Sequence, residues 1–360
     1  MPDRDLPERF EFEGVGVPLG ASRDFAVPIT QSSSGGTVSL PVRVLRGDEE
    51  GPCVFVTGAV HGDELNGVGV VRGLLRGDEL ALQRGTLILV PVVNVLGFER
   101  RSRYLPDRRD LNRSFPGLRA GSGASRLANR IFRTIVDRSD FGIDLHTGAA
   151  HRTNFPNVRG DLRNPGVRRL ALAFGTEVIV NSRGPKGSLR QAATKAGCPT
   201  IVLEGGEIGK AEPGVVAVGI RGIHNVLVEL GMSAGEIERP AFQVRVNETR
   251  WMRSDYGGLL EYHIAPGEAI EKGQEVATCT DLLGREVGQV LSKDSGIVIG
   301  LTTSPAVTPG DPVCHIAIPA GGIEDIAATI EDDNTTLLDE VREQLASSVT
   351  IAETGDSEGD

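Results

Sequence analysis

The sequence predicts an α/β fold in which a mixed, mostly parallel sheet is flanked by helices and is followed by a small all-β barrel or sandwich. Between residues 38 and 238, short apolar runs alternate with stretches of helical periodicity, which is the pattern of strand–helix units in a parallel sheet. From 241 to 318, short alternating runs are separated by Gly and Pro, as in small all-β domains. A chain of 360 residues is long enough for both parts.

The elements of the first part follow from the pattern in order. Strands are expected at 37–44, 52–56 and 86–93, with a helix at about 64–75 between the last two. Residues 94–123 lack periodicity and are expected to form a long loop, which in a compact domain is usually functional. The pattern then predicts helix 125–138, strand 141–145, helix 165–174, strand 177–181, helix 188–196, strand 200–203 and helix 214–230.

Four segments result from this pattern. Residues 1–37 are expected to be an irregular lead-in, 38–238 an α/β domain, 239–320 a β-rich domain and 321–360 an acidic tail. The tail holds twelve acids and one base, which accounts for the whole net charge of −11, and the preceding 320 residues hold 37 of each. An amphipathic helix is expected over 322–346, and the last dozen residues are expected to be disordered.

Composition also bears on the class of protein. No run approaches the ~20 apolar residues of a membrane span, and no basic patch indicates a nucleic-acid partner. The start of the chain lacks the basic and apolar regions of a signal peptide. Four cysteines lie far apart among apolar neighbours, which favours reduced, buried thiols in a cytoplasmic protein. A small molecule is therefore the expected partner.

The first candidate site is the segment HGDE at 61–64, where a strand gives way to a helix. An imidazole at His61 and a carboxylate at Glu64 are three positions apart and can converge on one ion, and zinc accepts this donor mixture. The alternative is that the two acids simply favour a helix N-terminus.

The second candidate is DLHTG at 144–148. Side chains alternate along a strand, so Asp144 and His146 share a face. His146 is then a third metal ligand, and Asp144 accepts a proton from the imidazole of His61 or His146. The alternative is a histidine satisfied within the core.

The third candidate is DLNRSFPG at 110–117, inside the long loop. The pair Asn112 and Arg113 suits fork-like recognition of a carboxylate. The alternative is a solvated loop in which Arg113 forms an ion pair with Asp110. His263 and His315, in the β-rich part, have no acidic neighbour at metal-ligand spacing, so the sequence assigns them no site.

In this combination and order, the three motifs resemble those of the succinylglutamate desuccinylase/aspartoacylase family of the zinc carboxypeptidase superfamily, over about residues 40–320. The resemblance implies a zinc carboxypeptidase-like α/β domain followed by a β-rich domain. It also implies one zinc ion per subunit held by His61, Glu64 and His146, with Asn112 and Arg113 binding the substrate carboxylate.

The resemblance further implies a general base and an arginine that polarises the scissile carbonyl. Glu204, which follows the strand at 200–203 and precedes a glycine, matches the family's catalytic glutamate, with Glu207 as the second choice; a solvated turn is the alternative for both. Arg103 is the best match for the arginine, while Arg100 and Arg101 remain open.

Arg190 is a further candidate for substrate binding or, alternatively, a charge on a helix surface. The predicted function is zinc-dependent hydrolysis of the amide bond of a small N-acyl amino acid or related N-acyl compound. The alternatives are a zinc carboxypeptidase acting on short peptides and a non-catalytic binding module. No nucleic acid or membrane partner is expected, and an assembly of identical subunits is compatible with the sequence.

Overall fold

In the computed structural model, the residues described are 10–77, 81–324, 326–327, 337–349 and 351. The strands are β1 (Phe10–Phe12), β2 (Val15–Val17), β3 (Ser22–Gln31), β4 (Thr37–Arg46), β5 (Glu49–Gly58), β6 (Arg84–Val90), β7 (Phe141–His146), β8 (Arg152–Gly160), β9 (Val178–Asn181), β10 (Thr200–Gly206), β11 (Val244–Val246), β12 (Glu248–Arg253), β13 (Gly258–Tyr262), β14 (Ala269–Ile270), β15 (Glu275–Thr280), β16 (Glu286–Leu291), β17 (Gly296–Thr302), β18 (Ala306–Val307) and β19 (Pro312–Ile318). The helices are α1 (Asn66–Arg76), α2 (Val95–Glu99), α3 (Gly123–Thr134), α4 (Pro165–Phe174), α5 (Leu189–Lys195), α6 (Pro213–Glu229) and α8 (Leu337–Ala346), with short 3₁₀ turns η1 (Leu111–Arg113) and η2 (Val136–Arg138).

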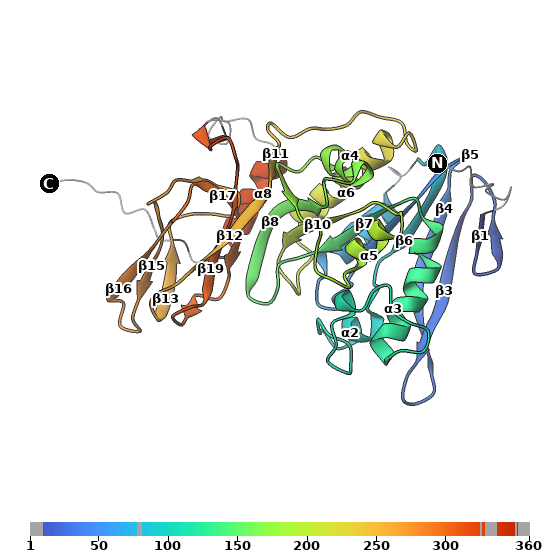
Figure 1. The fold of residues 1–360 in the computed structure, drawn as a ribbon, viewed down its shortest axis with the longest axis horizontal. Coiled ribbons are helices and arrows are strands. Elements are labelled where there is room, and N and C mark those ends of the chain that lie inside the picture. The colour runs from blue at the N-terminus through green and yellow to red at the C-terminus, as the bar shows by residue number, and fades with distance from the viewer. Residues whose placement is uncertain (1–9, 78–80, 325, 328–336, 350, 352–360) are drawn as a thin grey trace.

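A large mixed sheet dominates the molecule. Its main path runs β12-β19-β17-β8-β10-β7-β5-β6-β4-β3, and the central strands β6, β5, β7 and β10 are parallel (Figure 1). The chain goes from β5 to β6 on one side and returns to β7 on the other, so the direction of winding reverses between β5 and β7. The predicted fold class is confirmed, and the reversal marks the place where ligands of open α/β sheets usually bind.

Alternating residues of β5 show why the sheet needs helices on both faces. Cys53 and Phe55 pack into an apolar cluster with α3 and α5, whereas Val54 and Val56 pack into a second cluster with α1, α4 and α6. Because side chains of a strand point to opposite faces in turn, an apolar run of this kind is buried only when both faces are covered.

The C-terminal β-rich part continues the large sheet. Strand β17 pairs with β8, and β11 pairs with β9, so strands on both sides of residue 239 belong to one sheet. A second, four-stranded antiparallel sheet, β16-β15-β13-β18, packs on β12, β17 and β19 through a shared apolar core. Tyr262 donates a hydrogen bond from its hydroxyl to the Val313 carbonyl at 3.0 Å across this core. The result is sandwich-like, with the end of the large sheet as one layer.

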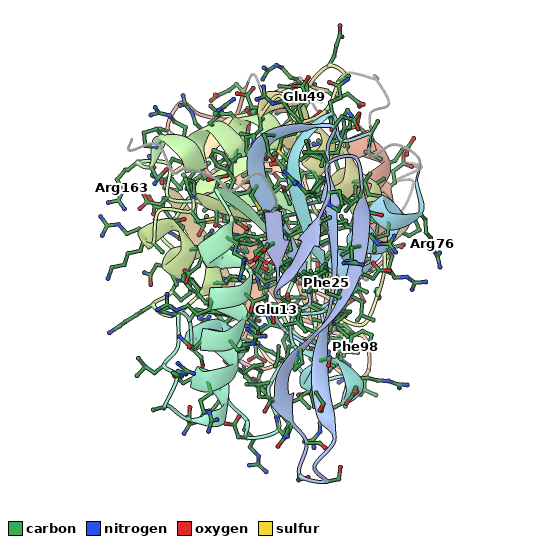
Figure 2. All side chains as sticks on the ribbon, turned by 90° about the vertical axis from the view of Figure 1, so that its right-hand side faces the viewer. Glu13, Phe25, Glu49, Arg76, Phe98 and Arg163 are labelled. Carbon is green, nitrogen blue, oxygen red and sulfur yellow. The ribbon has the colours of Figure 1, made fainter. Side chains whose placement is uncertain are left out.

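The expectation of an irregular lead-in is wrong for residues 10–31, which form β1, β2 and β3. Strand β3 pairs with β4 in a long antiparallel hairpin whose strands face the viewer in Figure 2, with Phe25 labelled on it. Most side chains of β3 are exposed, so backbone pairing with β4 stabilises this strand. An exposed edge strand lacks the apolar alternation that sequence patterns detect.

A second difference is strand β8, which the sequence pattern did not predict. Its residues, RTNFPNVRG, include Asn, Pro and Gly, and the pairing of β8 with β10 is interrupted by a bulge between Asn154 and Asn157. The bulge lets Asn154 and Asn157 face the same side although they are three positions apart, which breaks the two-residue period of an ordinary strand. The long loop at 94–123 also contains α2 and η1.

Part of the acidic tail packs against the α/β domain. Helix α8 lies within the predicted helix 322–346, and its Leu338, Val341 and Leu345 are buried against Phe155 of β8 and against α6. Burying three such side chains contributes roughly 1.5–3 kcal/mol each. The segment predicted to be disordered lies, apart from Val349 and Ile351, outside the described residues.

Two further observations concern the whole chain. Among the described residues, no helix is both long and apolar enough to cross a membrane. All four cysteines are free and buried.

Candidate functional site

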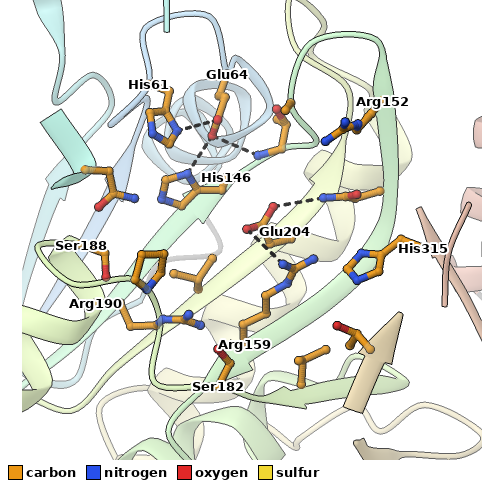
Figure 3. Close-up of a pocket in the computed structure, with 18 of the residues that line it drawn as sticks. His61, Glu64, His146, Arg152, Arg159, Ser182, Ser188, Arg190, Glu204 and His315 are labelled. Carbon is orange, nitrogen blue, oxygen red and sulfur yellow. Dashed lines mark hydrogen bonds and ion pairs between the residues drawn. The ribbon is translucent and has the colours of Figure 1, made fainter. Parts of the chain in front are cut away.

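Predicted site residues follow the carboxyl ends of three adjacent parallel strands. His146 is the last residue of β7, and in the register of β7 with β10 it lies opposite Glu204. Strand β5 pairs with the other side of β7 and ends at Gly58, opposite Leu145, three residues before His61. Residues that are distant in sequence therefore meet at one edge of the sheet (Figure 3).

The turn after β5 has an unusual backbone that brings His61 back over the sheet edge. Ala59 adopts a φ of 47°, in the left-handed region that non-glycine residues rarely occupy. At Gly62, a Cβ atom would lie 2.1 Å from the Gly97 carbonyl carbon of α2, so only glycine fits there. Strained or crowded backbone of this kind is often concentrated at functional sites.

His61, Glu64 and His146 form a compact buried group. The Nδ1 atom of His61 lies 2.6 Å from Glu64 Oε1, and the Nδ1 atom of His146 lies 2.8 Å from Glu64 Oε2. One donor atom from each residue lies within 4.8 Å of the others. The exposed fractions are 3%, 1% and 6%, so the group is shielded from bulk water.

The outer nitrogen of each imidazole faces a second carboxylate. His146 Nε2 lies 2.8 Å from Asp144 Oδ2, and His61 Nε2 lies 3.2 Å from Asp110 Oδ1. Of the two options left open for Asp144, the structure therefore places it on His146. Asp110, the partner of His61, was not predicted from the sequence. Asp110 lies two positions before Asn112 and accepts a hydrogen bond from its backbone N–H at 2.8 Å, a local loop contact that does not indicate the contact with His61.

The electrostatics of this group favour positive charge between its members. Burial alone lowers the pKa of His61 and His146, but the adjacent carboxylates outweigh it, and both pKa values are raised, that of His146 strongly. Burial alone raises the pKa of Glu64, but the two imidazoles outweigh it and the pKa is lowered. Burial likewise raises the pKa of Asp110, but its hydrogen bond with His61 brings it down to about 2. Carboxylates that stay ionised around two nitrogen donors attract a cation.

Of the three open arginines, the structure places Arg103 at this group. Its Nη1 donates to Glu64 Oε1 at 3.0 Å, and its Nη2 lies 3.5 Å from Asp110 Oδ2. Arg100 and Arg101 are exposed and do not line the pocket.

Asn112 and Arg113 lie on the same side of the pocket. Asn112 is buried, and its Oδ1 accepts a hydrogen bond from the Leu189 N–H at 2.8 Å, which fixes the orientation of the carboxamide. Arg113 is about half exposed, and its Nη1 donates to the Asn112 carbonyl at 2.7 Å. Its contact with Asp110 is long, at 4.0 Å, so most of the guanidinium remains available to a ligand.

Glu204 lies in the middle of the pocket and is oriented from β8 (Figure 3). Asn154 donates to Glu204 Oε2 at 3.1 Å, and Arg159 Nη1 lies 3.9 Å from Oε1. Both partners were missed because β8 itself was missed. The second choice, Glu207, instead pairs with Lys210 at 2.7 Å and accepts from the Thr303 hydroxyl, outside the pocket lining.

Arg190 is not a helix-surface charge. It is 7% exposed and lines the pocket, and its Nη1 has no hydrogen-bond partner among the described residues. Burial, with the nearby Arg159 as a second cause, lowers its pKa to about 10, so it stays charged at neutral pH.

The remaining wall comes from the C-terminal β-rich part. His315 on β19 and Trp251 on β12 stack with ring centroids 4.4 Å apart and planes at 8°, and the Arg152 guanidinium of β8 lies 4.7 Å from the Trp251 ring centroid. All three line the pocket, whose volume is about 630 Å³. His315 was not expected at this pocket, since only the pairing of β17 with β8 and of β17 with β19 brings it there.

Comparison with known proteins gives one consistent relationship. The sequence model of the succinylglutamate desuccinylase/aspartoacylase catalytic domain matches residues 50–230. The chain is 30% identical to an N-alpha-acetyl-L-2,4-diaminobutyric acid deacetylase from Halomonas elongata, over 85% of this chain and 93% of the relative.

Solved structures agree with this relationship. A product-bound ectoine utilization protein from Ruegeria pomeroyi is 25% identical with a TM-score of 0.72, covering 84% of this chain and 97% of the other. A succinylglutamate desuccinylase/aspartoacylase from Rhodobacter sphaeroides is 27% identical with a TM-score of 0.71, covering 83% and 96%.

Proposed function

Because the chain belongs to the succinylglutamate desuccinylase/aspartoacylase family, we propose that it is a zinc-dependent deacylase that hydrolyses the amide bond of a small N-acyl amino acid or related N-acyl compound. The observation that carries the proposal is the buried group of His61, Glu64 and His146 beside Glu204 in one polar pocket. The deacetylase from Halomonas elongata, similar along most of this chain, supports the reaction class.

The donor set fits zinc. Two imidazole nitrogens and a carboxylate oxygen are the ligands found in catalytic zinc sites, which keep a further position for water. Asp110 and Asp144 hydrogen-bond the outer nitrogens, as carboxylates commonly do for zinc-binding histidines, and fix the imidazole orientation. A zinc ion held there lowers the pKa of water toward about 7 and polarises a carbonyl group.

Glu204 is proposed as the general base and acid. Its carboxylate is oriented by Asn154 and stays partly accessible to the pocket, with a side chain about 20% exposed. It takes a proton from the attacking water and gives a proton to the leaving amine nitrogen, so that one residue serves both steps. Arg103, which contacts Glu64, is proposed to stabilise the negative charge that develops on the carbonyl oxygen.

A substrate carboxylate is proposed to bind on the side of Asn112 and Arg113. The guanidinium of Arg113 remains largely available there, and the buried Arg190 offers an unpartnered Nη1 within the same pocket. Planar guanidinium groups bind carboxylates through paired hydrogen bonds, which positions the amide relative to Glu204.

We propose that the enzyme is cytoplasmic because its four cysteines are unpaired and buried. None is paired, and burial raises the pKa of both Cys53 and Cys198 to about 12, so that neither thiol is reactive. Buried reduced thiols are typical of proteins from reducing compartments.

The test is a hydrolysis screen on the purified chain with measured zinc content. N-acetyl and N-succinyl amino acids and short dipeptides are assayed before chelation, after chelation and after zinc is restored. We expect release of free amine from at least one N-acyl amino acid, loss of turnover on chelation and recovery with zinc. Release of C-terminal residues from dipeptides alone would instead indicate a carboxypeptidase. Zinc binding without any turnover would indicate a non-catalytic binding protein.

A further inference from the structure

A buried pair of side chains contacts the turn that follows Glu204, and the proposed hydrolysis does not use it. Asn66 is the first residue of α1, and Glu212 directly precedes α6. Their exposed fractions are 2% and 7%, and neither residue lines the pocket. Among the described residues, no cation forms an ion pair with Glu212, so only N–H donors contact its carboxylate. Because burial of polar groups costs free energy unless they are hydrogen-bonded, the contacts of this pair show what it holds in place.

The two side chains bind each other and the turn. Asn66 Nδ2 donates to Glu212 Oε2 at 2.7 Å and to the Gly205 carbonyl at 3.1 Å. Asn66 Oδ1 accepts from the Glu212 N–H at 2.7 Å, and Glu212 Oε2 also accepts from the Glu207 N–H at 3.0 Å. Both the amide group and the oxygen of the Asn66 carboxamide are therefore engaged, which fixes its orientation.

The backbone at Gly206 leaves just enough room for this pair. Gly206 adopts a φ of 70°, in the left-handed region that favours glycine. A Cβ atom there would lie 1.8 Å from Glu212 Oε2 and 2.3 Å from Asn66 Nδ2. A side chain at this position would displace both groups, so the pair and the turn fit together only with glycine.

Backbone hydrogen bonds tie the same turn to both segments that carry proposed zinc ligands. The Gly209 N–H donates to the carbonyl of Asp63, in the HGDE segment, at 2.8 Å. The Gly148 N–H, in the DLHTG segment, donates to the Gly206 carbonyl at 2.9 Å. Asn66, which begins the helix after HGDE, adds a side-chain connection to the same turn. The turn therefore cannot shift without breaking contacts to the ligand-bearing segments.

We propose that Asn66 and Glu212 are positioning residues that hold the Glu204 carboxylate in place relative to the proposed zinc ligands. This inference rests on the proposed function, because it takes Glu204 as the group that transfers the proton. Neither residue lines the pocket, so each acts through the turn that follows Glu204 and not on the substrate. A displacement of about 1 Å, caused by a change far from the reacting atoms, can lower a rate by about 100-fold.

Alanine variants test the pair. In zinc-loaded Asn66→Ala and Glu212→Ala, we expect kcat on the best substrate of the hydrolysis screen to fall by about 10- to 100-fold. KM and zinc content should change less than about 3-fold, because neither residue lines the pocket. Glu212→Gln keeps an acceptor oxygen for Asn66 and for the Glu207 N–H, so its kcat should stay within about 3-fold of wild type.

Asn225→Ala is the matched control. Asn225 is a fully buried asparagine of α6 whose carboxamide donates to the carbonyls of Phe174 and Glu238 and accepts from the Glu238 N–H. It is outside the pocket lining and makes no hydrogen bond to the turn after Glu204. Denaturant unfolding is measured for every variant, and kcat at a temperature where each is folded. Asn66→Ala and Asn225→Ala should both lose stability, but only Asn66→Ala should lose kcat.

Combination with Glu204→Gln shows whether the pair acts through the base. Residues that act as a unit have non-additive effects, so adding Asn66→Ala to Glu204→Gln should lower kcat by less than about 3-fold further. A loss that adds fully to that of Glu204→Gln would overturn the proposal. So would a near-wild-type kcat in both folded, zinc-loaded alanine variants, which would leave the pair a role in stability alone. If the wild type hydrolyses no compound of the screen, the proposed function itself fails, which is a different result from turnover that is insensitive to the pair.

Discussion

The two sides of the pocket differ in how completely their polar groups are satisfied. On the side of the proposed metal ligands, Glu64 lies between His61 and His146, and each imidazole also faces an outer carboxylate. On the opposite wall, Arg152 has no carboxylate partner, and His315 makes no side-chain hydrogen bond among the described residues. A saturated cluster holds its geometry before a ligand arrives, which suits catalysis, whereas an unsaturated wall gains its contacts from the ligand, which suits selection.

The largest effect is expected on the saturated side. His146→Ala removes one of three proposed ligands, so zinc content should fall well below one per chain and kcat should drop by about 10⁴-fold or more. The zinc content is measured by elemental analysis after dialysis. The activity is measured with the best substrate of the hydrolysis screen. His263→Gln is the matched control, since the His263 side chain is 36% exposed in the β-rich part and its imidazole contacts Thr278 and Glu275, outside the pocket lining. Full zinc content in His146→Ala would refute the assignment of this residue as a ligand.

Glu204→Gln should separate chemistry from metal binding. The carboxamide keeps the size of the side chain but cannot take up the proton, so kcat should fall by about 10²- to 10⁴-fold while zinc content stays at the wild-type value. Steady-state kinetics and elemental analysis are run on the same preparation, with Glu207→Gln as the control outside the pocket. Near-normal turnover in Glu204→Gln would assign the proton transfer to another group.

The same division explains what the sequence could predict. His61 and Glu64 lie in one short motif, and His146 ends an apolar strand, so strand order alone brings them to one edge. Arg152 and Asn154 lie on a strand whose bulge and Pro hide its period. His315 reaches the pocket only through the pairing of β19 with β17 and of β17 with β8, whose partner residues are 146 to 150 positions apart. Such long-range pairing has no local signature. The exposed strand β3 was missed for a related reason, because without buried alternation nothing in its sequence marks it.

A smaller effect is expected when the outer carboxylates are changed. Asp144→Asn and Asp110→Asn remove the charge behind one imidazole each, and such changes typically weaken metal binding by about 10- to 100-fold. Asp144 should have the larger effect, because it is fully buried at 2.8 Å from His146, whereas Asp110 is partly exposed at 3.2 Å from His61. Zinc affinity is measured by competition with a chelator. A larger loss of zinc affinity in Asp110→Asn than in Asp144→Asn would contradict the prediction, because it would mean that burial and hydrogen-bond length do not set the contribution of each carboxylate.

The smallest effect on activity is expected for a change in helix α8, which packs on β8 on the side away from the pocket. The same change should have a specific effect on stability. Helix α8 covers the back of β8, where Arg342 contacts Glu177 and its guanidinium lies 5.0 Å from the Phe155 ring centroid. Arg342→Met removes the ion-pair partner of the buried Glu177 and leaves only the more distant charge of Arg221, which should lower the free energy of unfolding by about 3 kcal/mol at alkaline pH, where Glu177 is ionised. Since neither Arg342 nor Phe155 lines the pocket, kcat at 25 °C should change less than about 3-fold.

The pH dependence identifies the cause of that loss. Burial raises the pKa of Glu177 from its ordinary 4.5 to about 7 even with Arg342 present, and removal of the guanidinium raises it further. A carboxyl group whose pKa is higher in the folded state stabilises the fold below the unfolded pKa, and this contribution is lost as the pH rises through the folded pKa. The difference between Arg342→Met and wild type, measured by denaturant unfolding, should therefore stay constant at acidic pH and begin to grow as the pH rises through about 7, the folded-state pKa of Glu177 in the wild type. Replacing Glu177 by Gln in the same chain should abolish that growth. If the difference in the free energy of unfolding does not depend on pH, the stabilising contribution of Arg342 comes from its packing on Phe155 and not from its ion pair with Glu177.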